Sequence, residues 1–403
     1  MNCRICAQNE LKEMIDFGSF PISNRYKKKA HDQEETFSLA LGQCGHCSTV
    51  QLTKSVPAPK LVPTYDWIKY NEPEPHLDGM VEKILKLPGI HTGSTFCGVT
   101  FKDDSTLQRF ENKGYKKIYR LDMKNDLGID FKGAGVETIQ GRLTPQRARD
   151  IRSKKGSFDV VIARHILEHV YDINSFVEAL KILTSPNGYI VFEVPDCSRA
   201  IDLLDYTTLW EEHTLYFTPE TFRGTFGHLG LSLAGFENYP YPFENSLVSI
   251  CQLREEKNQF TSVPQTEFLR MKRFVDNFPV RKKQLREFLS DYRKNTGKIA
   301  LFGAGHLACT YVVMFELRGL IEFFVDDDPN KTGLFMAGCG LPIYKSAALI
   351  KEKINLCLLS LNPLSEEKVM KLNQTFLEQG GTFASIFPGS KHALQLNPVE
   401  ARP

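Results

Sequence analysis

The sequence has almost no net charge: 50 Lys and Arg side chains face 48 Asp and Glu side chains, which leaves +2. Such a chain lacks the basic excess that proteins use against nucleic acid or anionic membranes, so neither partner is expected. A bilayer-spanning apolar run is also missing, since one of the most apolar stretches, residues 299–315, carries His306. The first ten residues contain no apolar segment of a signal peptide. We therefore expect a cytoplasmic protein, a monomer or a homodimer.

Internal repeats and low-complexity tracts are absent as well, which excludes solenoids, propellers and fibres. The 403 residues are 42% hydrophobic, enough for several domains with cores of their own. Proline-rich passages at 56–63 and 72–75 mark a boundary. The predicted parts are an N-terminal module (1–75), an α/β domain (76–253), a helical connector (254–297) and a second α/β domain (298–403).

The central part alternates between strand and helix patterns. Residues 158–163 and 188–194 are short apolar runs, and residues 173–183 between them have helical spacing that should stop at the Pro-Asn-Gly of 186–188. This order predicts an α/β fold with a doubly wound parallel sheet. We also predict a helix over 78–87, strands over 95–100, 117–121 and 298–302, and a packed pair of helices in 254–297.

Four of the ten cysteines form two C-x-x-C pairs, Cys3 with Cys6 and Cys44 with Cys47. Each pair brings two sulfurs to one ion from a tight turn, and two pairs complete the four-thiolate set of a structural zinc site. The 37 residues between the pairs (7–43) require a small hairpin subdomain as a bridge. The alternative is four unrelated structural cysteines. His46 lies inside the second pair and is expected to be solvated rather than a ligand.

Proton-transferring side chains follow the strand predicted at 158–163. His165 and His169 come directly after it, and Glu212, His213 and Tyr216 crowd together later. Residues at the carboxyl end of a parallel strand face the ligand crevice, and groups that exchange a proton near neutral pH suit deprotonation beside a ketone. A lone histidine beside an apolar strand is usually packed, which is our expectation for His165.

These motifs, in order, resemble the sugar C-methyltransferase family, which acts on nucleotide-linked keto-deoxysugars. The similarity covers nearly the whole chain: the cysteine module, residues 17–24, residues 163–169, Glu212-His213 with Tyr216, and the C-terminal part. It implies a zinc module followed by two Rossmann-like domains. It also implies that S-adenosylmethionine and a thymidine-diphosphate sugar meet between these two domains.

The resemblance further implies that a base removes a proton beside the ketone and that the enolate attacks the sulfonium methyl group. On that pattern His213 is the base, Glu212 is its neighbour and His169 is the second imidazole near the sugar ketone. Tyr216 is a candidate for positioning the substrate. Trp210 stands where the family has a tyrosine, so that hydroxyl contact is lost.

The cofactor loop departs from the family pattern. The family's E-I-G-S-N-D-G-T-L-L is V-T-F-K-D-D-S-T-L-Q here (99–108), with Phe101 and Ser105 in place of both glycines. A phenyl ring should close the pocket unless the loop is rebuilt, and Gly98 offers a shifted turn. Asp122 suits ribose hydroxyls, or is a solvated loop residue. The predicted cofactor-binding positions are Gly98, Phe101, Asp104, Ser105, Asp122 and Ala163.

The C-terminal part opens with Gly303-Ala-Gly305 in a G-x-G-x-x-A pattern, and Asp326 follows 23 residues after Gly303. Alone this fingerprint favours a nicotinamide dinucleotide. The resemblance instead implies a domain that completes the substrate cleft without that cofactor. The predicted substrate-binding set is Gly303, Gly305 and Asp326 together with Ser246, which comes from the segment that replaces the family's H-G-G-S.

Three functions follow from these observations. The first is a C-methyltransferase with an unusual cofactor loop. The second is an isomerase, epimerase or dehydratase of a nucleotide sugar that uses His213 without a methyl donor. The third is a non-catalytic relative that binds a sugar nucleotide or a partner protein.

Overall fold

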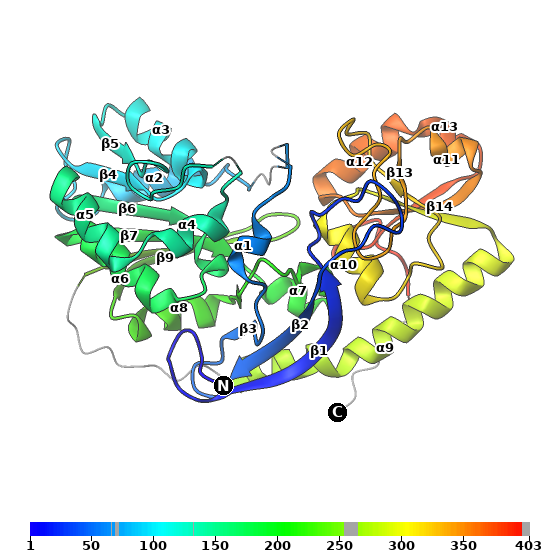
Figure 1. Ribbon diagram of the computed structural model, residues 1–403, viewed down its shortest axis with the longest axis horizontal. Coiled ribbons are helices and arrows are strands. Elements are labelled where there is room, and N and C mark those ends of the chain that lie inside the picture. The colour runs from blue at the N-terminus through cyan, green and yellow to red at the C-terminus, as the bar shows by residue number, and fades with distance from the viewer. Residues whose placement is uncertain (66, 69–71, 132, 254–264, 397–403) are drawn as a thin grey trace. The chain divides into compact units, whose positions relative to one another are not determined.

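The computed structural model describes residues 1–65, 67–68, 72–131, 133–253 and 265–396, and its chain forms two compact units (Figure 1). The first unit comprises Met1–Glu13, Leu41–Ser198 and Glu212–Phe268. The second comprises Met14–Ala40, Arg199–Glu211 and Leu269–Pro403. Each unit is therefore assembled from three separate segments of the sequence.

A six-stranded sheet forms the centre of the first unit. Its strands are β4 (Thr95–Gly98), β5 (Lys117–Arg120), β6 (Phe158–Arg164), β7 (Thr184–Pro195), β9 (Ser232–Tyr239) and β10 (Ser246–Gln252). The strand order is β5-β4-β6-β7-β10-β9, with β10 antiparallel to both of its neighbours and the other pairs parallel. The predicted doubly wound α/β fold is confirmed.

Helices cover both faces of this sheet. They are α2 (Leu77–Leu85), α3 (Asp104–Asn112), α4 (Val136–Arg142), α5 (Pro145–Lys155), α6 (Ile173–Leu183) and α8 (Pro219–His228). Successive side chains of a strand point to opposite faces, so Val160 and Ile162 of β6 join α2 and α3 in one cluster. Val161 and Ala163 join α4, α5, α6 and α8 in the other. Figure 1 shows the two helix layers on either side of the strands.

The topology fixes where a ligand can bind. The chain order reverses at β4, whose neighbours are β5 on one side and β6 on the other. In open α/β sheets the crevice outside the carboxyl ends of the strands at such a point is the usual ligand site. The segments that follow β4, β6 and β7 are therefore the ones that carry the candidate site.

A smaller sheet accompanies the cysteine pairs, with the order β1-β2-β3-β8. Its strands are β1 (Leu11–Pro21), β2 (Thr36–Cys44), β3 (Val50–Leu52) and β8 (Leu215–Tyr216). β1 and β2 are neighbours and take up most of the sequence between the two cysteine pairs, as the predicted hairpin bridge requires. The remaining short elements are α1 (Ala58–Leu61), η1 (Phe101–Asp103), η2 (Leu167–His169), α7 (Ser198–Asp202) and η3 (Tyr206–Thr208).

The second unit contains a five-stranded parallel sheet in the order β13-β12-β11-β14-β15. Its strands are β11 (Lys298–Phe302), β12 (Phe324–Val325), β13 (Ile343–Tyr344), β14 (Ile354–Leu359) and β15 (Thr382–Ser385). Its helices are α9 (Gln265–Asn295), α10 (His306–Met314), α11 (Ala348–Lys351), α12 (Pro363–Leu372) and α13 (Gln374–Glu378). The strand predicted at 298–302 coincides with β11.

Two local predictions were wrong. The expected helix pair is one continuous helix, α9, which passes through Pro279 (Figure 1); residues 254–264 of that prediction lie outside the described residues. Helix α6 ends at Leu183 as predicted, yet strand β7 begins at once with Thr184 and includes Pro186. A register shift against β6 between Phe158 and Val160 accommodates these residues.

Within the described residues, no helix combines the length and the apolar character needed to cross a lipid bilayer.

The packing of the first unit predicts the effect of Phe96→Ala. Phe96 is fully buried, and its ring stacks on Phe110 with the ring centroids 4.1 Å apart. Removing a buried ring leaves a cavity, so we expect the free energy of unfolding to fall by ~3–5 kcal/mol. Phe131→Ala, at an exposed phenylalanine of the same unit, is the matched control and should change it by less than ~0.5 kcal/mol. Urea denaturation monitored by circular dichroism measures both, and equal losses would contradict this packing.

Candidate functional site

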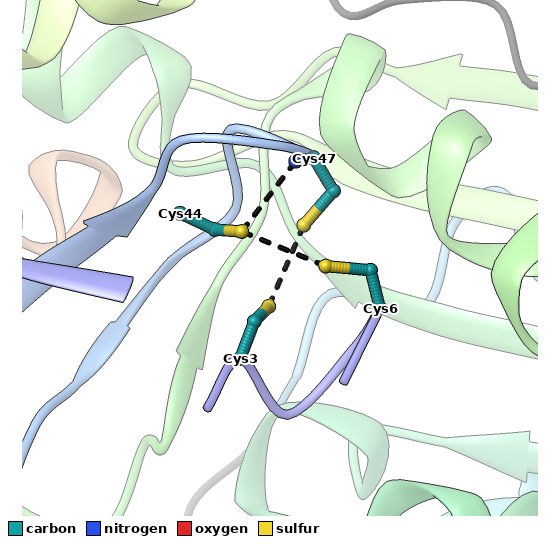
Figure 2. A group of neighbouring side chains, drawn as sticks. All are labelled: Cys3, Cys6, Cys44 and Cys47. Carbon is teal, nitrogen blue, oxygen red and sulfur yellow. Dashed lines mark hydrogen bonds between the residues drawn. The ribbon is translucent and has the colours of Figure 1, made fainter. Parts of the chain in front are cut away.

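The four cysteine sulfurs converge on one point (Figure 2). Sγ of Cys3 lies 3.5 Å from Sγ of Cys47, and Sγ of Cys6 lies 3.6 Å from Sγ of Cys44. All four sulfurs lie within 4.8 Å of one another. A tetrahedral zinc site with Zn–S bonds of about 2.3 Å separates its sulfurs by about 3.8 Å. The cluster therefore fits a four-thiolate zinc ion.

The two C-x-x-C turns are built alike. The residue after each pair, Ala7 or Ser48, has a left-handed φ of 57°, and its N–H bonds back to the carbonyl of the first cysteine of the pair. Backbone N–H groups of His46 and Cys47 point at Sγ of Cys44, an arrangement that favours thiolate. With four sulfurs in place no ligand position is left for substrate, which indicates a structural role.

A second cluster lies at the carboxyl edge of the main sheet in the first unit. It consists of Glu137 from α4, His169 from η2, and Glu212 and His213 from the segment before β8. Oε1 of Glu137 lies 3.0 Å from Nδ1 of His169. The rings of His169 and His213 are perpendicular, with centroids 4.7 Å apart. Glu137, His169 and Glu212 are buried, whereas His213 is half-buried and can meet a ligand.

Backbone hydrogen bonds hold these segments together. The N–H of Thr214 donates to the carbonyl of Glu168 at 2.7 Å, and its hydroxyl donates to the carbonyl of Val170 at 2.7 Å. Because Thr214 directly follows His213, this clamp fixes that histidine against η2. The structure thus brings together three of the four predicted catalytic residues, His169, Glu212 and His213. The ring of Tyr216 lies further away, 6.3 Å from that of His213.

Glu137 and His169 each favour the charged form of the other. Burial alone would lower the pKa of His169, but the nearby carboxylate of Glu137 outweighs it and raises that pKa. Burial alone would raise the pKa of Glu137, yet His169 and Glu212 lower it.

Sequence reasoning missed a buried ionic network beside this cluster. Glu193, at the end of β7, is fully buried and bonds Nε of Arg164, and its other oxygen lies 3.1 Å from Nε2 of His165 and 3.0 Å from Nε2 of His76. The hydroxyl of Ser246 also donates to Glu193. Arg164 and His165 directly follow the strand predicted at 158–163, and this position in the sequence could have indicated the network. Ser246 was predicted to bind substrate, and in the structure its hydroxyl is hydrogen-bonded within this network.

Lys102 and Glu72 extend this network, with Nζ of Lys102 2.6 Å from Oε1 of Glu72. Burial alone would lower the pKa of His165, but Glu72 and Glu193 raise it to about 10. Burial would raise the pKa of Glu72, but His165 and Lys102 lower it to about 2. His165 is packed as expected, and it is packed as a cation with a left-handed φ of 47°.

The carboxylate of Asp103 bonds to the backbone of the loop after β4, to which Asp103 itself belongs. Oδ2 of Asp103 accepts hydrogen bonds from the N–H groups of Val99 (2.9 Å) and Thr100 (2.8 Å), and Oδ1 accepts one from the N–H of Arg164 (3.0 Å). A Cβ at Gly98 would lie 2.8 Å from Cβ of Asp103. Asp103 is the N3 residue of a capping box on η1, so its carboxylate satisfies the N–H groups of this loop. Burial raises the pKa of Asp103 to about 7.

The other predicted cofactor residues are dispersed around this loop. The ring of Phe101 was expected to close the cofactor pocket. It is instead 46% exposed and is not buried over the strand ends. Asp104 pairs with Arg120, and Ser105 donates to Glu74. Asp122 is exposed after β5, and its Oδ1 accepts from two backbone N–H groups of its own turn. Ala163 is buried, and its side chain belongs to the core.

In the second unit the glycine loop is closed by the predicted acidic residue. Gly303 has a φ of +98°, and a Cβ there would lie 2.5 Å from the carbonyl oxygen of Ser360. Oδ2 of Asp326 accepts the N–H of Ala304 at 3.0 Å and lies 2.8 Å from Nζ of Lys331. A Cβ added at Gly305 would point into open space among the described residues, so a ligand can approach the backbone there.

The cysteine cluster predicts the metal content of the protein. The purified protein should contain one equivalent of zinc when its metal content is measured by mass spectrometry. Cys44→Ser should lose this zinc, and its N-terminal segment should unfold at a lower temperature than in wild type. Cys251→Ser, at a buried cysteine outside the cluster, should keep the metal. Wild-type protein that stays zinc-free after zinc-replete expression would contradict this site.

The buried network predicts a pH-dependent stability. Because the pKa of His165 is raised from 6.5 to about 10 in the folded state, its contribution is full below pH 6.5 and is lost as the pH rises towards 10. The difference in thermal midpoint between wild type and His165→Gln should therefore shrink over that interval. The exposed His91→Gln should show no such trend. A constant difference for His165→Gln would rule out its cationic state.

Three family models match the chain in succession. "Putative zinc binding domain" matches residues 3–61, "Methyltransferase domain" matches residues 106–234, and "C-methyltransferase C-terminal domain" matches residues 248–388. The first match contains all four clustered cysteines, and the second contains Glu137, His169 and His213.

Individual proteins resemble parts of the chain. C-methyltransferase NovU of Streptomyces niveus is 22% identical over 220 residues, which is 54% of this chain and 52% of NovU, so the chain spans about half the length of this curated relative. A Burkholderia thailandensis 1,6-didemethyltoxoflavin-N1-methyltransferase structure is 10% identical with a TM-score of 0.30, covering 44% of this chain and 76% of its own. A SAM-dependent methyltransferase from Anabaena variabilis is 13% identical with a TM-score of 0.31, covering 44% and 85%.

Because these TM-scores are low, the fold is assigned from the strand order of the sheet and not from these structures. The three models follow one another from residue 3 to residue 388 and name a zinc-binding, a methyltransferase and a C-methyltransferase C-terminal domain. The chain is therefore similar, part by part, to the domains of a C-methyltransferase.

Proposed function

We propose that this protein transfers a methyl group from S-adenosylmethionine to a carbon beside the ketone of a nucleotide-linked keto-deoxysugar. The observation that carries the proposal is the pair of imidazoles at the carboxyl edge of the main sheet, one ion-paired with Glu137 and the other half-buried. The family models support the methyl transfer, and the resemblance in sequence supports the sugar.

The chemistry asks for two different groups. Removing a proton beside a ketone requires a base, and the enolate oxygen that forms requires a hydrogen-bond donor or a positive charge. His213 is the more exposed imidazole and serves as the base. His169, whose pKa is raised by the carboxylate of Glu137 despite its burial, stabilises the negative oxygen. The two rings touch, so both groups reach the same small part of a substrate.

The methyl donor supplies an electrophilic carbon for the enolate. The loop 98–105 and Asp122 are the residues that would hold it, since the N–H groups of Val99 and Thr100 already converge on a carboxylate. Both N–H groups are bonded to Asp103, so a donor that used them would require Asp103 to release them. Ser246, Gly303, Gly305 and Asp326 stay predictions for the nucleotide sugar, as does the monomeric or homodimeric state.

A second function is favoured by the same loop. Asp103 satisfies the N–H groups that a donor needs, and neither family glycine is present at positions 101 and 105. An enzyme that only moves protons beside the ketone, an isomerase, epimerase or dehydratase, needs His213 and His169 but no donor. Net conversion of the sugar nucleotide to an isomer or a dehydrated product in the absence of S-adenosylmethionine separates it from the methyltransferase, because proton exchange alone is expected of both.

The base assignment predicts the behaviour of His213→Asn. Loss of the proton acceptor should slow transfer of a labelled methyl group to a keto-deoxysugar nucleotide by ~10²–10⁴. Affinity for S-adenosylhomocysteine, measured by calorimetry, should stay within a few-fold of the wild-type value. An unchanged rate would remove His213 from the mechanism. If wild-type protein showed no affinity for S-adenosylhomocysteine at millimolar concentration, the proposal that S-adenosylmethionine is the methyl donor would be wrong.

A further inference from the structure

The ring of His169 is contacted by a carboxylate from a distant part of the chain. Glu137 comes from the first turn of α4, 32 residues before His169, and its side chain approaches Nδ1 of that ring to 3.0 Å. Both residues are buried, at 4% and 6% exposure. Two charges so shielded from water attract each other with little screening, and this attraction acts against the burial that opposes a charge on the ring.

Among the described residues, charged and titratable groups near His169 come from several elements. Glu137 belongs to α4, Glu168 to η2 with an oxygen 4.0 Å from Nε2 of His169, and Lys102 to η1. Glu212 and His213 belong to the segment before β8. Glu137 and Glu168 favour the cation and Lys102 opposes it, and Glu137 makes the shorter of the two carboxylate contacts.

Glu212 is a second neighbour of Glu137. One side-chain oxygen of Glu212 lies within 4.8 Å of a carboxylate oxygen of Glu137 and of a ring nitrogen of His169. Both His169 and Glu212 favour the charged form of Glu137.

A charged His169 affects its neighbour directly. The ring of His213 meets that of His169 edge to face at 4.7 Å, and two imidazolium rings at that distance repel each other. Because Glu137 stabilises the cation on His169, the repulsion acts against a second charge on the half-buried His213. A neutral imidazole accepts a proton, whereas an imidazolium does not.

We propose that Glu137 is a positioning residue that selects the base: by pairing with Nδ1 of His169 it holds that ring as the cation and leaves His213 neutral. This inference rests on the proposed function for its catalytic meaning. The distribution of charge between the two rings is a property of the protein alone and can be measured without any substrate.

Histidine titrations in the full-length protein provide the test. With ¹³C-labelled histidine, ring carbon shifts report the charge of each imidazole, and His169→Gln assigns the two signals. Glu137→Gln should reduce the proton affinity of His169 by at least ~10-fold, one pKa unit. Glu137→Asp, which keeps a carboxylate, should restore part of it. His169→Gln should raise the pKa of His213, because its charged neighbour is gone.

Two matched controls sharpen the titration. Glu212→Gln keeps the size of this side chain and leaves Glu137 in place, so the pKa of His169 should change less than in Glu137→Gln. Asp159→Asn, at a carboxylate that accepts from Thr95 at the opposite end of β6, should leave both histidines unchanged. An unaltered His169 in Glu137→Gln would overturn the proposal, as would a charged His213 at neutral pH in wild type.

Methyl transfer then separates this inference from the proposed function. Where transfer occurs, Glu137→Gln should lower kcat by ~10–10² with KM nearly unchanged and should shift the acidic limb of the pH profile. If no keto-sugar nucleotide is methylated while the titrations follow the expected pattern, the proposed function fails and the role of Glu137 stands. If Glu137→Gln does not fold, the wild-type and His169→Gln titrations still decide, because they need no change at Glu137.

Discussion

The carboxyl edge of the main sheet depends on one buried charge, the carboxylate of Glu193. It lies at the end of β7 with no exposure to water and is surrounded by Arg164, His165, His76 and the hydroxyl of Ser246. A carboxylate so deeply buried is tolerated only when positive charges and hydrogen bonds replace its hydration. These partners come from β6, from the turn before α2 and from β10, so the charge ties three parts of the first unit together.

This network and the cluster around His169 share one construction. In each, a buried carboxylate raises the pKa of a histidine, His165 beside Glu193 and His169 beside Glu137. The difference lies in access. The Glu193 network is sealed and stabilises the edge, whereas the His169 cluster adjoins the half-buried His213. Rigid charges behind an accessible base are what enolate chemistry requires, since they need no rearrangement when negative charge develops.

Much of the fold was predictable from the sequence. Strand β11 and helix α6 begin and end where their apolar patterns place them, because those patterns are strong and bounded by polar residues. The long helix α9 was predicted as two helices, but it continues through Pro279. Proline weakens a helix locally, but the apolar stripe of Met271, Phe274, Phe278, Leu285 and Leu289 is buried on both sides of it, and packing decides.

The sequence alone determined the cysteine spacing, the doubly wound α/β order and the pairing of Glu212 with His213, because each is a pattern among near neighbours. Only the tertiary structure decided which groups carry charge. Glu137 reaches His169 from a distant helix, and Asp103 fills a loop whose sequence suggested obstruction by Phe101. Ionisation depends on burial and on partners from remote segments, and neither is encoded in local spacing.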